Sequence, residues 1–163
     1  GTSRRQRQMC IRDSFLGQYI QWDGKGNAEI AKKKGFKVYE KDVEGSIVNY
    51  ENLDNVYMRI HDYFKFLKYG YDRVTDWCCT HIRRGRMTRE EAVKINQLKS
   101  GKFPEEYLGY KLSEVLDEIN CSREEFINIC DKFTNNSLFV CNNKNELVKD
   151  ENLNLLLKNN EYK

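Results

Sequence analysis

The sequence predicts a mostly α-helical domain with one or two strands near its N-terminus. Three observations lead to this prediction. Apolar residues recur at helical spacing in several segments after residue 53, capping residues precede most of these segments, and the run most typical of a strand lies at residues 15–23. With 39% hydrophobic residues among 163, the chain has enough apolar side chains for one modest core.

The first 14 residues, GTSRRQRQMCIRDS, differ in composition from the rest and have neither helical nor strand periodicity. We expect residues 1–14 to be a non-native leader, because QRQMCIRDS resembles a translated sequencing adaptor; the alternative is a basic arm that contacts phosphates. Four arginines and one aspartate in this segment account for the net charge of +3, and the remaining residues carry 24 basic and 24 acidic side chains. A neutral body favours a small anionic ligand over a long polyanion.

From residue 15 the elements follow in order. FLGQYIQWD, residues 15–23, is apolar and aromatic and predicts a strand that turns at Gly24. GNAEIAKKKGF predicts a short helix that stops at Gly35, and FKVYEKDVEG predicts an extended piece.

A strong amphipathic helix is predicted between an Asp54 N-cap and Gly70. Residues 72–84 predict a second helix, on which four polar residues share one face: Arg73, Asp76, Thr80 and Arg83. That stripe is consistent either with a surface ion pair or with the lining of a cleft.

Three further helices are predicted from capping residues. Thr88 and Ser122 are each followed three residues later by a glutamate, and Ser113 precedes a shorter apolar stripe. From Asn142 the composition is polar, so residues 140–163 are expected to be a loosely ordered tail with a last helical turn at Leu153–Leu157.

No motif in the chain defines a reaction by itself. A glycine-rich phosphate loop, an HExxH motif and a CxxC pair are all absent from the sequence, so the cysteines are expected to be free thiols and no metal site is predicted. Six cations lie within 22 residues: Lys65, Lys68, Arg73, Arg83, Arg84 and Arg86. Such a cluster is typical of phosphate binding or of a solvated basic face.

Five elements together resemble the N-acetyl sugar amidotransferases of the ATP-pyrophosphatase (PP-loop) superfamily, over residues 15–139. They are FLGQYIQWDG, VEGSIVNYENLDN, HDYFKFLKYGYDRVTD, IRRGRMTREEA and EEFINICDKFTN. The resemblance implies the C-terminal helical portion of an α/β PP-loop fold, and therefore a fragment. The chain departs from the family pattern at YIQWD, where YIPWD is usual, and at Trp77 and Cys78, where small residues are usual.

The resemblance also implies a function in surface-polysaccharide and nonulosonic-acid biosynthesis. A cytoplasmic enzyme of this type uses ATP and Mg²⁺ to convert an acetamido group of a sugar to an acetamidino group. Glutaminase and cyclase-like partner subunits supply the ammonia. The superfamily's SGGxDS loop is absent from this sequence, so the isolated chain is expected to be inactive.

Within the matched region, the resemblance and the cation cluster together suggest the site residues. We expect the cations to hold phosphate or substrate and Asp76 to orient Arg73 or the substrate. Glu44 and Asn49 are second-rank candidates for contacting the sugar. The candidates are Lys68, Arg73, Asp76, Arg83, Arg86, Glu44 and Asn49.

Two alternatives come from other classes of protein. LSEVLDEINCSREEFINICDKF is consistent with a helix-turn-helix, although Glu124 and Glu125 stand where a recognition helix would offer donors to bases. The second alternative is a subunit-docking module that uses the aromatic helix at 54–69. We expect no nucleic-acid partner, and no membrane span, because no apolar run approaches about 20 residues.

Overall fold

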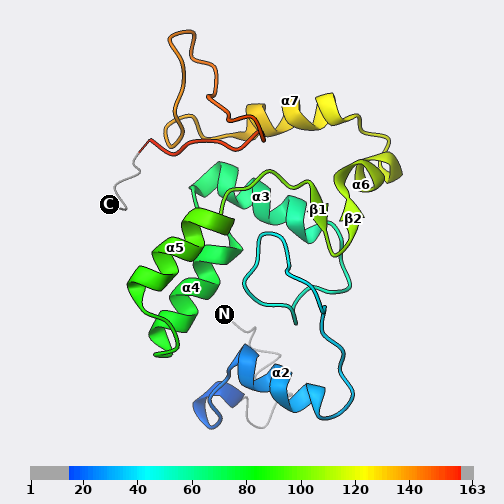
Figure 1. Ribbon diagram of the computed structural model, residues 1–163, viewed down its shortest axis with the longest axis vertical. Helices are drawn as coiled ribbons and strands as arrows, with labels where there is room; N and C mark the ends of the chain where they lie inside the picture. The colour runs from blue at the N-terminus through cyan, green and yellow to red at the C-terminus, as the bar shows by residue number, and fades with distance from the viewer. Residues whose placement is uncertain (1–14, 159–163) are drawn as a thin grey trace, which may run out of the picture. The chain divides into compact units, whose positions relative to one another are not determined.

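The computed structural model describes residues 15–158, and the chain divides after Lys37 into two compact units. The described part of the first unit holds a short 3₁₀ helix, η1 (Leu16–Gln18), and α2 (Gly24–Lys32). The second unit begins at Val38 and holds all the other elements (Figure 1). These are α3 (Met58–Tyr69), α4 (Arg73–Arg83), α5 (Arg89–Lys99), β1 (Glu106–Tyr107), β2 (Tyr110–Lys111), α6 (Leu112–Glu118) and α7 (Arg123–Phe133). The predicted mostly α class is confirmed.

The strand predicted at residues 15–23 is wrong. This segment forms η1, in which the Gln18 N–H donates to the Phe15 carbonyl at 2.9 Å. Among residues 15–37 there is no strand to pair with, and an unpaired strand would leave its backbone groups without hydrogen bonds, so a local turn is favoured. The helix predicted to follow is confirmed as α2, with the Asp23 carboxylate accepting from the Gly26 N–H at 3.1 Å.

α3 ends where the sequence predicts, at Gly70, whose φ of 76° is left-handed. Its start differs from the prediction. Asp54 does not cap the helix; residues 52–57 form turns, the Asn55 side chain accepts from the Tyr57 N–H at 3.0 Å, and α3 begins at Met58. The competing turn chemistry of Asn55 therefore delays the helix by one turn.

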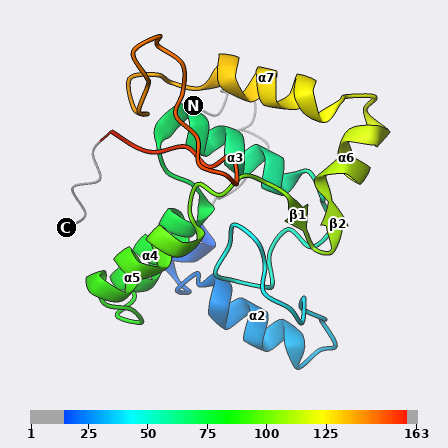
Figure 2. The same cartoon turned by 45° about the horizontal axis from the view of Figure 1, so that its top comes forward.

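α4 and α5 lie side by side as a helical hairpin in both views (Figures 1 and 2). Each begins at a capping side chain, Asp72 for α4 and Thr88 for α5, and Thr88 forms the predicted reciprocal box with Glu91. Between the two helices lies a small apolar cluster centred on Val74, Cys78 and Ala92.

β1 and β2 form an antiparallel hairpin that the sequence analysis did not predict. Its two-residue turn, Leu108–Gly109, has positive φ at both positions, as a tight hairpin requires, but lacks the usual Asn-Gly signal. α6 then starts two residues earlier than predicted, with Lys111 rather than Ser113 as its N-cap. α7 begins at the predicted Ser122 box.

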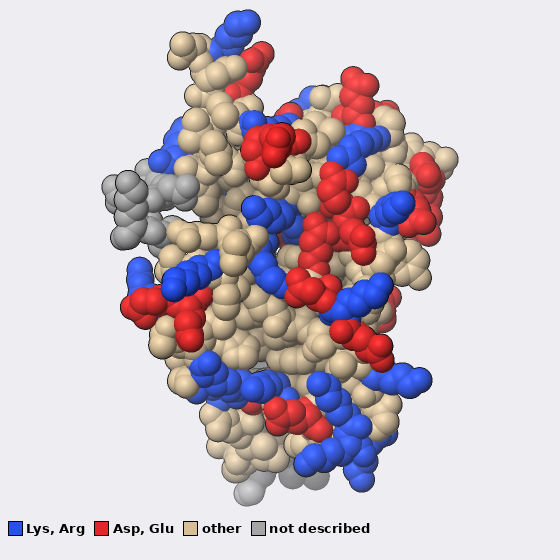
Figure 3. All heavy atoms as spheres, in the orientation of Figure 1, with Lys and Arg blue, Asp and Glu red and all other residues tan. Residues whose placement is uncertain are grey.

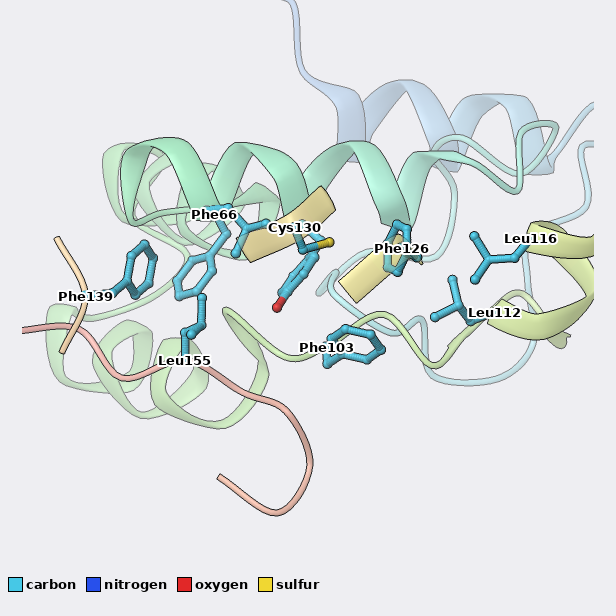
Figure 4. Packing of buried hydrophobic residues seen from close by; sticks show 10 residues of the cluster. Phe66, Phe103, Leu112, Leu116, Phe126, Cys130, Phe139 and Leu155 are labelled. Carbon is cyan, nitrogen blue, oxygen red and sulfur yellow. The ribbon is translucent and has the colours of Figure 1, made fainter. Parts of the chain in front are cut away.

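The main core lies between α3, α6 and α7 (Figure 4). Phe66 of α3 meets Phe139 edge-to-face at 5.3 Å between ring centroids, and Phe103 meets Phe126 of α7 at 6.0 Å. The cluster contains Tyr63, Phe66, Leu67, Phe103, Leu112, Leu116, Phe126, Cys130, Phe139 and Leu155. Burial of ten such side chains gives the second unit a core of its own.

The expectation of a loosely ordered tail is wrong for residues 140–158. Isolated β-bridges pair Phe139 with Leu157 and Lys149 with Leu155, and the predicted helical turn at 153–157 does not form. Leu155 is 7% exposed and belongs to the core. The few leucines of this polar segment therefore hold it against α3. Residues 159–163 lie outside the described residues, as do residues 1–14 of the expected leader.

α3, with 12 residues, is the longest helix of the described chain. A membrane-crossing helix needs about 20 apolar residues. No helix within residues 15–158 has the length and apolar character to cross a membrane.

Candidate functional site

The candidates Glu44 and Asn49 lie on the loop that precedes α3, residues 38–57. The Asn49 side-chain amide donates to the Tyr39 carbonyl at 2.7 Å, and the Tyr39 N–H donates to the Asn49 carbonyl at 3.0 Å. The Glu44 carboxylate accepts from the Glu106 N–H in β1 at 2.8 Å. Both side chains therefore hold the loop in place, and Glu44 links it to the β-hairpin.

Arg73, in the first turn of α4, is paired with an acid that the sequence analysis did not single out. Its Nε and Nη2 donate to the two carboxylate oxygens of Asp62 in α3, at 2.6 and 3.1 Å. Its Nη1 lies 3.5 Å from the Glu51 carboxylate, which also accepts from the Trp77 indole N–H at 2.9 Å. Burial alone would lower the pKa of Arg73, but the hydrogen bonds and charge of Asp62 outweigh burial and raise the pKa.

We call Glu51, Asp62, Arg73 and Trp77 the Arg73 network. Its members come from the loop, α3 and α4, so it fastens three segments together. Tyr50 extends it by an edge-to-face contact with Trp77 at 5.8 Å. Asp62 and Arg73 are 11 residues apart, and no periodicity of a single helix could have revealed their contact.

Arg59 is a second buried charged residue that the sequence analysis did not single out. It lies in the first turn of α3 and is 2% exposed. Its Nη2 donates to the Lys102 carbonyl, while Nε and Nη1 have no hydrogen-bond partner among the described residues. Gly45 covers the guanidinium: a β-carbon built on Gly45 would lie 2.6 Å from Nη1.

The pKa values of two carboxyl groups influenced by the Arg59 charge are raised. Burial raises the pKa of Glu44, against the opposing effects of the Arg59 charge and the backbone hydrogen bonds. Burial also raises the pKa of Asp72, although it accepts from the Gly101 and Val74 N–H groups at 2.9 and 3.0 Å. The Arg59 charge opposes the effect of burial on the pKa of both carboxyl groups.

The remaining candidates do not gather around the Arg73 network. Asp76 pairs with Lys65 of α3 and Arg73 with Asp62, so of the two roles expected for Asp76 the orientation of the substrate stays a prediction. Lys68 is exposed at the end of α3, with its ammonium 5.2 Å from the centre of the Tyr69 ring. Arg83 is exposed and its guanidinium lies 3.4 Å from the Thr80 hydroxyl, while Arg86 is exposed in the loop after α4.

The cation cluster seen in the sequence is thus spread over the second unit. Arg73 and Arg83 occupy opposite ends of α4, about 15 Å apart at the rise of an α-helix. The exposed cations Lys68 and Arg83 remain available for ligands, whereas Arg73 is committed to Asp62.

A groove of about 540 Å³ lies between α4, α5 and residues 150–157. Its floor includes Phe66, Val93 and Leu155. Several polar groups on its walls already bond within the protein: the Thr75 hydroxyl contacts the Asn96 side chain at 3.1 Å, and the Asn154 side chain accepts from the Phe103 N–H at 2.8 Å. None of the seven predicted site residues lines this groove.

The described residues do not build a site for ATP and Mg²⁺. Within residues 15–158, no group of three His, Cys, Asp or Glu side chains is placed to hold a metal ion. The sequence contains no glycine-rich phosphate loop, and the five cysteines of the described region are free thiols. These residues therefore do not fit the nucleotide and metal that the resemblance implies.

The model of the family described as LPS biosynthesis protein WbpG-like, C-terminal domain, matches residues 44–152, about two thirds of the chain. A comparison with curated proteins found no match. The family match contains the Arg73 network, Arg59 and all seven predicted site residues.

Proposed function

Because the chain belongs to the WbpG-like LPS biosynthesis proteins, through their C-terminal domain at residues 44–152, we propose that it is part of an ATP-dependent N-acetyl sugar amidotransferase. The family gives the chain a role in LPS biosynthesis. In the proposed reaction the acetamido oxygen of the sugar attacks the α-phosphate of ATP and pyrophosphate leaves. Ammonia then adds to the activated carbon and AMP leaves, which produces the acetamidino group.

The observation that carries this proposal is the overlap of two sequence likenesses. Four of the five elements that resemble the amidotransferases lie within residues 43–135, and the family match extends over residues 44–152. The elements are also structurally central: they contain Glu51, Asp62 and Arg73 of the Arg73 network and the capping box of α5. A chance resemblance in surface loops would not select these positions.

We assign the second unit, which begins at Val38, the role of binding the sugar substrate rather than ATP. The loop at 38–57 offers polar groups beside the Arg73 network, where Glu44 and Asn49 are positioned by backbone hydrogen bonds. Lys68 and Arg83 are exposed cations suited to a phosphate of a nucleotide-linked sugar. ATP, Mg²⁺ and the ammonia-supplying glutaminase and cyclase-like subunits belong to the remainder of the proposed enzyme.

α7 gives no support to the alternative of a nucleic-acid binder. Its first turn carries Glu124 and Glu125, and the Glu125 carboxylate is engaged by the Ser122 N–H and hydroxyl at 2.8 Å each. A recognition helix presents donors and cations to the groove at this position. Acidic residues there would repel phosphate.

The test is a direct assay on the full-length protein that carries this domain. The purified protein is given ATP, an N-acetylated sugar nucleotide and an ammonium salt, which replaces the glutaminase. We expect mass spectrometry to show one sugar oxygen replaced by NH, with AMP and pyrophosphate formed in equal amounts. Release of ADP and phosphate, or an unchanged sugar over a panel of N-acetylated substrates, would contradict the proposal. The 163-residue chain alone should give no turnover.

A further inference from the structure

Residues 15–37 have a large apolar surface and almost no interior. Phe15, Tyr19 and Trp22 are 80%, 75% and 70% exposed, and Ala28 is the one buried residue of this segment. The other large apolar side chains exposed here are Leu16, Ile20, Ile30 and Phe36. Seven exposed large hydrophobic residues in a segment of this length exceed what isolated surface residues explain.

This segment cannot be stable as a free unit. α2 has nine residues, and isolated helices shorter than about 12–15 residues are marginal in water. Residues 15–37, with one buried alanine, lack the apolar burial that would offset the entropy of ordering their backbone. The helix of this segment and its cap at Asp23 therefore require packing against another surface.

The second unit does not depend on these residues for its core. Its ten-residue cluster is complete from Tyr63 to Leu155, and the family's C-terminal domain begins at residue 44. Residues 15–37 thus precede the C-terminal domain and lie outside it. The family description calls residues 44–152 a C-terminal domain. The structure next to residues 15–37 on their N-terminal side is therefore the domain that precedes it.

We propose that the apolar surface of residues 15–37 docks on the domain that precedes the C-terminal domain in the full-length protein. The charge of the segment describes the matching surface. Five lysines stand against Asp23 and Glu29, and Figure 3 shows blue side chains gathered around tan surface where Figure 1 labels α2. The surface that receives the segment is therefore apolar with an acidic rim.

Trp22 provides a direct probe, because the chain has two tryptophans and the other, Trp77, lies in the second unit. In the 163-residue chain, the variant W77F leaves Trp22 as the sole indole, and W22F leaves Trp77. In the full-length protein, whose other domain can carry further tryptophans, the signal of each indole is the difference between proteins with and without it. We expect acrylamide to quench Trp22 several-fold more strongly in the 163-residue chain than in the full-length protein. Trp77 should be quenched equally in both. If W77F does not fold, fluorotryptophan labelling and fluorine NMR of the wild-type sequence make the same comparison.

A second variant tests which side chains make the contact. Ile20→Ser in the full-length protein should restore quenching of Trp22 toward the value in the isolated chain. Leu98→Ser, at a residue of α5 that is 72% exposed, is the matched control and should leave Trp22 protected.

Three results would overturn the proposal: equal quenching of Trp22 in both proteins, protection already present in the isolated chain at low concentration, or protection that appears as the chain is concentrated. Protection in the isolated chain at low concentration would mean that the apolar surface packs on the rest of this chain. Protection that appears on concentration would mean that it packs on a second copy. The proposal rests on the family assignment, and its readout is independent of amidotransferase turnover, so failure of the proposed reaction would leave this test decisive.

Discussion

The guanidinium of Arg73 holds the carboxylate of Asp62 through two hydrogen bonds, of 2.6 and 3.1 Å, and so connects the first turn of α4 to the middle of α3. Asp62 is 7% exposed and Arg73 19% exposed in their side chains. A pair of this geometry is a strong charge-assisted contact. Removing Asp62 takes the bidentate partner from a largely buried guanidinium.

Asp62→Asn should therefore destabilise the chain by about 3 kcal/mol, because it breaks a buried pair and leaves Arg73 only the longer contact with Glu51 at 3.5 Å. Urea unfolding followed by circular dichroism measures the loss. The control is Glu105→Gln, which breaks the Arg123–Glu105 pair, whose side chains are 47% and 52% exposed. That pair should contribute about 0–1 kcal/mol. Equal losses in the two variants would show that Asp62 and Arg73 are not a buried pair.

Gly45 and Gly85 make a second matched comparison. Both have left-handed φ, 69° and 64°, but a β-carbon on Gly45 meets the Arg59 guanidinium, whereas one on Gly85 meets nothing within 4 Å. Gly85→Ala should lose about 1 kcal/mol from backbone strain. Gly45→Ala should lose about 2–4 kcal/mol, since Arg59 is enclosed and cannot move aside. Thermal unfolding of both variants decides the matter, and similar melting temperatures would mean that Arg59 is not packed under Gly45.

Asp72 should give the chain a recognisable pH dependence. Burial raises its pKa in the folded state above the ordinary value of 3.8, so the folded protein binds a proton more readily than the unfolded chain. The contribution of Asp72 to the free energy of unfolding is complete below pH 3.8 and is lost as the pH rises through the folded-state pKa. The stability of wild type relative to Asp72→Asn should therefore decrease with rising pH in that window. An unfolding series from acid to neutral pH measures the difference, and an increase instead would show that the backbone hydrogen bonds outweigh burial.

The thiols should react in an order set by burial. Cys79 is exposed, whereas Cys78 and Cys130 are 2% and 3% exposed. Burial raises the pKa of Cys130 to about 12, which leaves almost no thiolate near neutral pH. Iodoacetamide labelling followed by peptide mass spectrometry should modify Cys79 within minutes and Cys130 only after urea is added. Comparable labelling of Cys79 and Cys130 in the native chain would contradict the packing of α7.

Local chemistry explains which elements were predictable. Ser122 with Glu125, Thr88 with Glu91, and Gly70 act within one turn of their helices, so the sequence reveals them without knowledge of the fold. The tight hairpin at 106–111 lacked its usual signal because Leu108, rather than Asn or Asp, takes the left-handed conformation.

The site was predictable only in part, because its contacts are tertiary. The polar stripe correctly placed Arg73 and Asp76 on one helix, and helix spacing would pair them with each other. In the structure α3 supplies both partners: Asp62 binds Arg73 and Lys65 binds Asp76. An arginine at the start of an amphipathic helix reads as solvent-exposed. Only the packing of the 38–57 loop and Lys102 over Arg59 shows that it is buried.

The exposed cations give the prediction that bears most directly on function. Lys68 and Arg83 have solvent-exposed side chains, so replacing either with alanine should change the stability of the chain by less than about 0.5 kcal/mol. If they contact a phosphate of the substrate, each loss should lower kcat/KM of the full-length protein about tenfold, because hydrogen bonds to charged groups contribute about 1.5–3 kcal/mol.

The measurement is steady-state AMP release at varied concentrations of sugar nucleotide, with Lys132→Ala as the control. Lys132 is likewise exposed but lies in the last turn of α7. A rise in KM with unchanged kcat would mean that Lys68 or Arg83 binds substrate and transition state equally, and Arg83→Lys should restore part of the affinity because the charge remains while the two-pronged geometry is lost. Unchanged kinetics in both alanine variants would remove these cations from the site and leave the loop of Glu44 and Asn49 as its remaining candidate.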